Sequence, residues 1–132
     1  MSTHATGTFE QKSWDEKPTQ EIEGLPKLTR ASVTQSFQGD IEGEGSVEYL
    51  MVYPDDNSAS FVGLQRVVGR IGGRSGSFVL QVSGTFEGGL VQASWFVVPG
   101  SGTGDLLGLR GEGGFVAPRG PKAEITLDYD FE

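Results

Sequence analysis

The sequence contains no cysteine and a single histidine, His4. Without a thiol the chain can form no disulfide bond, no thiolate metal site and no cysteine nucleophile. Because His4 lies in the first few residues, where we expect the N-terminus to fray, it cannot support a serine–histidine–aspartate triad or a histidine-based metal site. The sequence therefore predicts neither a metal site nor a catalytic histidine.

Basic residues and long apolar runs are also scarce. Ten Lys and Arg stand against 18 Asp and Glu, which gives a net charge of −8. Nucleic acids and anionic membranes bind basic patches, so we expect neither as a partner. Residues 1–25 lack the apolar run of about 7–15 residues that a signal peptide needs, and no stretch approaches the ~20 residues of a membrane-spanning helix. We expect a cytoplasmic bacterial protein.

One glycine-rich segment, residues 100–105, resembles a phosphate-binding loop. However, Asp105 stands where a dinucleotide fingerprint needs glycine, no Gly-Lys-Ser/Thr follows, and no helix is predicted behind the segment. Asp55, Asp56 and Asn57 offer oxygen ligands for calcium but lack the remaining acidic positions of an EF-hand loop. We therefore expect no cofactor, and we interpret residues 100–105 as the entry to a strand.

Glycine is abundant, with 21 residues, and apolar residues alternate with polar ones along most of the chain. Such alternation is typical of strands with one buried face, and no window carries a helical stripe. The turn residues divide the chain into eight predicted strands: 6–14, 28–38, 43–53, 59–71, 75–86, 90–98, 104–116 and 122–131. We predict a single domain over residues 1–132, an all-β, eight-stranded antiparallel up-and-down barrel with little helix. A two-sheet sandwich is the alternative, but closure removes exposed edges.

Two-residue turns at Gly72-Gly73 and Gly88-Gly89 predict the register of three consecutive strands, because each turn pairs the residues on either side of it. Because paired residues on neighbouring strands point to the same face, the assignment of inward and outward side chains extends from each strand to the next. The face assigned to the interior holds Phe61, Gly63, Gln65, Val67, Phe78, Leu80, Val82, Phe86, Val91, Ala93, Trp95 and Val97. The opposite face holds Arg66, Arg70, Gln81, Ser83, Gln92 and Ser94.

Two segments, Gly-Arg-Ser-Gly-Ser-Phe-Val-Leu-Gln at 73–81 and Pro-Gly-Ser-Gly-Thr-Gly-Asp-Leu at 99–106, resemble a bacterial family known as domain of unknown function 3224. Shorter matches lie at residues 37–40, 49–51, 61–64 and 109–111. That family looks like the allene oxide cyclase barrel group, whose members share an eight-stranded barrel with a cavity and associate into oligomers. The resemblance implies this fold and a homo-oligomer, but no particular activity, because a shared barrel hosts unrelated chemistry.

Glu48 is the candidate catalytic residue, because it lies in mid-strand beside Tyr49 and Leu50 with no adjacent cation. Inside the barrel, desolvation would favour its protonated form and suit it to general acid–base catalysis. On the outside it is a solubilising charge. Both alternatives stay open, and the parity of Trp14 and Tyr49 is open as well.

The candidate ligand-binding residues come from the predicted interior face. Gln65 is suited to orient a ligand carbonyl or hydroxyl group, and Trp95 to supply a flat apolar wall with one N–H donor. A role in the packed core is the alternative for both. The predicted set is Phe61, Gln65, Phe78, Leu80, Val82 and Trp95.

These residues lead to one functional hypothesis and two alternatives. The hypothesis is a barrel that binds an apolar small molecule and directs an isomerisation, cyclisation or elimination, with Glu48 as base and Gln65 as hydrogen-bond partner. One alternative is a binding or carrier barrel without catalysis, and the other is an oligomeric structural or interaction protein.

Overall fold

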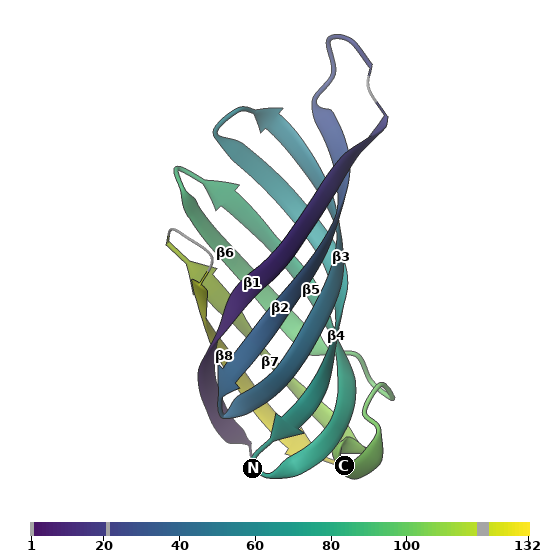
Figure 1. The fold of residues 1–132 in the computed structure, drawn as a ribbon, viewed down its shortest axis with the longest axis vertical. Coiled ribbons are helices and arrows are strands. Elements are labelled where there is room, and N and C mark those ends of the chain that lie inside the picture. The colour runs from purple at the N-terminus through teal and green to yellow at the C-terminus, as the bar shows by residue number, and fades with distance from the viewer. Residues whose placement is uncertain (1, 21, 119–121) are drawn as a thin grey trace.

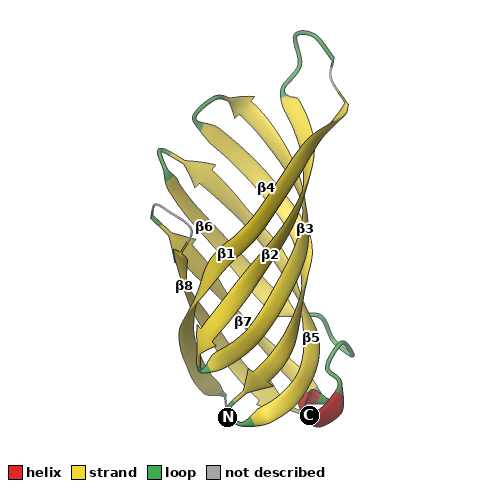
Figure 2. Ribbon diagram, viewed as in Figure 1, coloured by secondary structure: helices red, strands yellow, loops and turns green. Residues whose placement is uncertain are grey.

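The computed structural model describes residues 2–20, 22–118 and 122–132, and within them it contains eight strands and one 3-10 helix (Figure 2). The elements are β1 (Thr3–Gln20), β2 (Lys27–Gly39), β3 (Ile41–Asp55), β4 (Ser58–Ile71), β5 (Arg74–Glu87), β6 (Leu90–Val97), η1 (Gly104–Leu106), β7 (Leu109–Ala117) and β8 (Lys122–Phe131). None of the described helical residues forms a helix long and apolar enough to cross a membrane.

The strands form a closed barrel in chain order. Each strand pairs antiparallel with the next, and β1 pairs with β8 to close the ring (Figure 1). The predicted eight-stranded antiparallel barrel is thus confirmed, and the sandwich alternative is wrong. Closure satisfies the backbone hydrogen bonds that edge strands would leave open.

The predicted turns and register of β4, β5 and β6 are also confirmed. All four glycines of the two turns have positive φ angles between 57° and 85°, which side chains other than glycine rarely adopt. Ile71 pairs with Arg74, and Glu87 pairs with Leu90. The side chains assigned to the interior are buried or half-buried, and those assigned to the opposite face are exposed.

Two predicted strands differ from the structure. β1 runs to Gln20 rather than residue 14, and register shifts between Gln11 and Ser13 and between Pro18 and Gln20 let it continue beside β2. Its start at Thr3 includes His4, so the expected frayed segment is instead paired with β8. The strand predicted at 104–116 begins only at Leu109.

The late start of β7 follows from its glycines. Gly100, Gly104 and Gly108 have φ angles of 83°, 61° and 82°, which are incompatible with a continuous strand. The segment instead runs along the lower half of β5, where Thr103 N donates to Ser77 O at 2.9 Å. The 3-10 helix then inserts Leu106, which is fully buried, into the core.

The two ends of the barrel consequently differ. The chain termini and η1 lie at the lower end in Figure 1, and the hairpins β1–β2, β3–β4, β5–β6 and β7–β8 lie at the other. Large apolar side chains are fully buried in the half near η1: Ile41, Ile71, Phe78, Leu80, Leu106, Ile125 and Leu127. The half below the four hairpins is less completely filled.

Candidate functional site

A pocket of about 370 Å³ lies inside the barrel beneath the hairpin end. Its volume falls at the lower end of the range for small-molecule sites, roughly 300–1,000 Å³. The described residues that line it are Phe9, Gln11, Trp14, Gln35, Tyr49, Met51, Tyr53, Phe61, Phe86, Gly89, Val91, Phe115 and Ala117. No lysine, arginine, histidine or carboxylate is among them.

Aromatic rings form most of the pocket wall. Tyr49 contacts Phe61 edge to face with ring centroids 5.0 Å apart, and Trp14 lies 6.3 Å from Tyr49. Phe9 meets Phe115 at 4.9 Å. Edge-to-face contacts of this kind hold rings in defined positions, so the wall is apolar and ordered.

Two buried glutamines and a tyrosine place polar groups at the inner end of the pocket. Gln65 Nε2 donates a hydrogen bond to Gln35 Oε1, and both side chains are almost completely buried. Burial raises the pKa of Tyr49 far above its ordinary value, although a hydrogen bond with Gln35 opposes this. Gln65 Oε1 has no partner, which is costly for a buried acceptor.

A half-buried carboxylate, Glu16, lies on β1 near the pocket entrance. It accepts hydrogen bonds from Thr29 Oγ1 at 2.6 Å, Tyr53 O–H at 2.5 Å and Trp14 Nε1 at 3.0 Å. Burial by itself raises the pKa of Glu16, but these hydrogen bonds and the charge of Lys27 outweigh it and hold the pKa below its ordinary value. Burial and the neighbouring carboxylate raise the pKa of Tyr53 to about 12.

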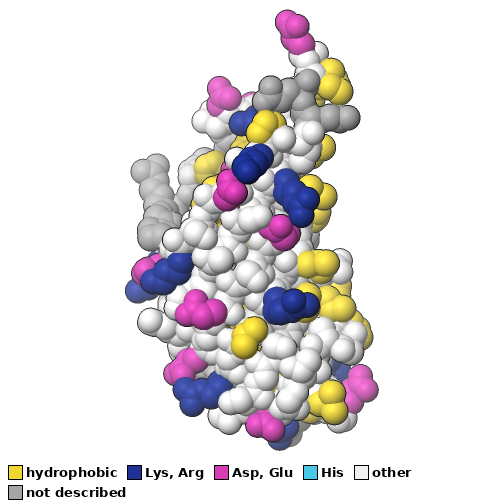
Figure 3. Space-filling model, turned by 45° about the vertical axis from the view of Figure 1, so that its right-hand side comes forward, with side chains coloured by type: hydrophobic (Ala, Val, Ile, Leu, Met, Phe, Trp, Pro, Cys, Tyr) yellow, Lys and Arg dark blue, Asp and Glu magenta, His cyan; other side chains and the backbone are white. Residues whose placement is uncertain are grey.

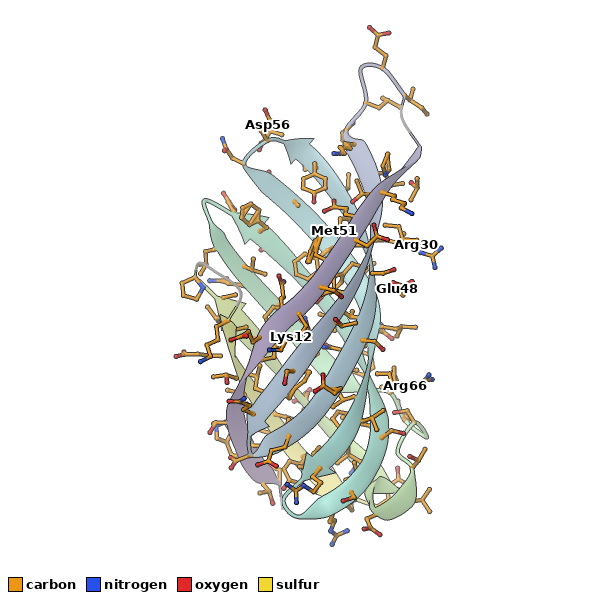
Figure 4. The ribbon with its side chains drawn as sticks, in the orientation of Figure 1. Lys12, Arg30, Glu48, Met51, Asp56 and Arg66 are labelled. Atoms are coloured by element: carbon orange, nitrogen blue, oxygen red, sulfur yellow. The ribbon has the colours of Figure 1, made fainter. Side chains whose placement is uncertain are left out.

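Glu48 does not lie in the pocket. It pairs with Ser32 and Leu64 on the outer face of the sheet, and its carboxylate lies 3.3 Å from Arg30 Nη2. Figure 4 shows Glu48 and Arg30 outside the barrel, whereas Met51 lies within it. The alternative that places Glu48 inside the barrel is wrong, so the catalytic role that required a desolvated carboxylate loses its support.

The predicted ligand-binding residues divide between the pocket and the packed core. Phe61 lines the pocket, and Gln65 binds the pocket-lining Gln35. Phe78, Leu80 and Val82 are buried and do not line it. Trp95 is buried as well, and its Nε1 donates to the Thr126 carbonyl at 3.0 Å, which satisfies its only donor.

The pocket residues that come from β1, β2 and β3 are absent from the ligand-binding set predicted from the sequence. Gln35, Met51 and Tyr53 have no predicted role, and local alternation does not assign Trp14 and Tyr49 to the inner or the outer face. The sequence does carry one signal for them. Gln35 and Tyr49 alternate in step with the apolar residues of their strands, which places them on the same face as those residues. Their parity could be assigned only by linking these strands to β4.

The surface candidates form no ion-binding group. Asn57 N donates to Asp55 Oδ1 at 2.8 Å, as in a solvated turn. Within residues 2–20, 22–118 and 122–132, no cluster of three or more His, Asp or Glu side chains is arranged to hold a metal ion.

Fold and site together define a class: an eight-stranded antiparallel barrel, filled at one end and with an aromatic-walled pocket at the other. The chain belongs to the family described as protein of unknown function (DUF3224), whose model matches residues 5–129. It is similar to a solved protein of unknown function from that family, from Shewanella oneidensis MR-1. The two share 29% identity and a TM-score of 0.79, over 100% of this chain and 99% of the other. A search of the curated proteins found no match.

Proposed function

We propose that this barrel binds a mainly apolar small molecule in the pocket beneath its hairpin end. The observation that carries the proposal is an aromatic wall around about 370 Å³, with Gln35 and Tyr49 as polar groups in the lining. Apolar pockets with a few well-placed polar groups are typical of ligand sites. The resemblance to the allene oxide cyclase barrel group supports the same reading.

The chemistry of the lining favours an uncharged ligand. A buried carboxylate needs a cation or several hydrogen-bond donors, and the described lining residues include no cation. Gln35 and Tyr49 instead suit a single hydroxyl, carbonyl or amide group. Glu16 at the entrance adds a negative charge that disfavours anionic ligands further.

Binding without catalysis is favoured over the isomerase, cyclase or lyase alternative. General acid–base catalysis near neutral pH needs a group that exchanges a proton there. The polar lining residues are glutamines and tyrosines, and the pKa values of Tyr49 and Tyr53 are raised away from neutrality. We therefore propose a carrier or sensor rather than an enzyme.

The test uses N-phenyl-1-naphthylamine, a neutral fluorescent probe, in equilibrium titrations. Val91→Phe fills the pocket from β6, whereas Val116→Phe makes the same change on the exposed outer face of the adjacent strand β7. We expect saturable binding to the wild type, a loss of at least about tenfold in affinity for Val91→Phe, and no change for Val116→Phe. Absence of saturable binding, or equal effects of the two variants, overturns the proposal.

Tryptophan fluorescence gives a second readout that does not depend on a pocket-filling variant. The chain has two tryptophans, of which Trp14 lines the pocket and Trp95 is buried outside it. Both indoles lie within energy-transfer range of the pocket, because Trp95 packs against the pocket-lining Phe115 with ring centroids 5.3 Å apart. Wild-type tryptophan emission should therefore fall as probe is added, with the same midpoint as the rise in probe fluorescence. Tryptophan emission that stays constant at saturating probe would contradict the proposal.

A further inference from the structure

A broad depression of about 950 Å³ is lined mainly by outward side chains of the barrel, and it shares Tyr49 with the lining of the interior pocket. Four large apolar side chains line it while remaining 42–55% exposed: Leu50, Val62, Leu64 and Phe96. In Figure 3, where the right-hand side of Figure 1 comes forward, hydrophobic side chains gather along one edge of the barrel. Large exposed apolar side chains that gather on one face of a protein are typical of an interaction site.

Charged residues line the margins of this depression, here called the wall, at Arg30, Glu48, Glu112 and Asp128, and its centre on β5 and β6 is free of charge. The outward positions of β5 between Arg74 and Glu87 hold serine, threonine, valine and glutamine, and those of β6 hold Leu90, Gln92, Ser94 and Phe96. This is unusual for a chain with 18 acidic residues and a net charge of −8. Interface cores are depleted of charged residues, and charges lie at their rims.

In the described part of the chain, two charges of opposite sign near this wall lack an ion pair: Glu112 lines it on β7, and Arg66 follows the wall residue Leu64 at the next outward position of β4. Arg66 on β4 is the described arginine that has neither a carboxylate within 4.0 Å nor an aromatic ring beneath it, and Figure 4 shows it pointing away from the barrel. Glu112 on β7 has no ion pair among the described residues and lies directly opposite Asp128 in the register. Like charges in opposed positions repel, so a cation placed beside Glu112 would relieve this repulsion.

We propose that a second copy of this chain covers this wall in a twofold-symmetric dimer, in which Arg66 of each copy pairs with Glu112 of the other. In a twofold-symmetric contact whose axis runs between Arg66 and Glu112, the side of the surface that carries Arg66 in one copy faces the side that carries Glu112 in its partner. The dimer therefore contains two equivalent Arg66–Glu112 ion pairs, one on each side of the twofold axis. The exposed apolar ridge of Val62 and Leu64 packs against the small outward side chains of β5 and β6.

The first test is a charge-swap experiment read by analytical ultracentrifugation. Arg66→Glu and Glu112→Arg should each raise the dimer dissociation constant by roughly tenfold or more, because each breaks both reciprocal pairs and adds repulsion. The double variant Arg66→Glu/Glu112→Arg should recover dimerisation to within about threefold of the wild type. Lys12→Glu, on the outward side of β1, is the matched control and should have no effect.

A second pair of variants tests the apolar part of the surface. Leu64→Asn should weaken the dimer, whereas Leu107→Asn, at a 74% exposed position outside the wall, should not. Circular dichroism confirms that each variant is folded. A monomeric wild type at all concentrations, an oligomer other than a dimer, or a double swap no better than its single variants would overturn the proposal.

Discussion

The unequal filling of the two barrel ends predicts that one substitution will have different costs at two positions. Val82 and Val91 both point inward, on the paired strands β5 and β6, but Val82 is fully buried in the core and Val91 lines the pocket. Val→Ala removes two methyl groups at either site. The two variants therefore compare a filled and an unfilled part of the same interior.

The expected magnitudes follow from burial. At Val82, loss of two buried methyl groups costs about 1.6 kcal/mol of transfer free energy, and the new void adds about 1 kcal/mol. At Val91, the side chain is only half-buried and already borders empty space, so no new void forms. We expect a loss of about 2.5 kcal/mol for Val82→Ala and below about 1 kcal/mol for Val91→Ala.

Urea denaturation followed by tryptophan fluorescence measures both free energies of unfolding, and equal denaturant slopes confirm that the comparison is valid. Val91→Ala should also bind N-phenyl-1-naphthylamine at least as tightly as the wild type, because the pocket is larger. Equal losses of stability at the two positions would refute the reasoning, since they would mean that the barrel is filled equally at both ends in solution.

Three further predictions concern single contacts. Gln65→Leu removes the donor to buried Gln35 Oε1 and should cost about 1–3 kcal/mol, and Gln35→Leu removes a partner of both Gln65 and Tyr49. Because the two variants break one shared hydrogen bond, Gln35→Leu/Gln65→Leu should cost less than the sum of the single losses in the same urea assay; additive losses would contradict this. Because the folded pKa of Glu16 is lowered, its contribution is present above the unfolded value and lost as the pH falls through the folded one. The melting-temperature gap between wild type and Glu16→Gln should therefore shrink below pH 4.5, and a constant gap would be contrary evidence. Gly76→Ala places a Cβ 2.0 Å from Thr103 O, so it should displace residues 99–108 and accelerate amide exchange at Thr103, while unchanged exchange would exclude that clash.

The face on which Glu48 lies depends on one extra residue in a hairpin. At the β3–β4 turn Asp55 pairs with Ser58, and an unbroken ladder from this pair would set Glu48 opposite the inward Gln65. A register shift between Val52 and Asp55 moves the pairing by one residue, so Glu48 instead faces Leu64 and points outward. A one-residue shift reverses every side chain that follows it.

That shift also brings Tyr49 and Met51 to the interior. The sequence around Tyr53 and Pro54 indicates a loop but not the position of the bulge, because nothing local requires it. The bulge becomes necessary only when β3 must pair with β2 on one side and β4 on the other. The pocket wall contributed by β1, β2 and β3 therefore could not be predicted by counting from the glycine turns.

By itself, the sequence determined the number of strands, their antiparallel order and the inward face of β4, β5 and β6. Those features depend on local alternation and on glycine pairs whose positive φ angles set the turns. The tertiary structure alone decided which end is filled, how residues 99–108 close it, and which side chains of β1 to β3 meet around the pocket. These depend on bulges and on closure of the ring, where strands distant in sequence constrain one another.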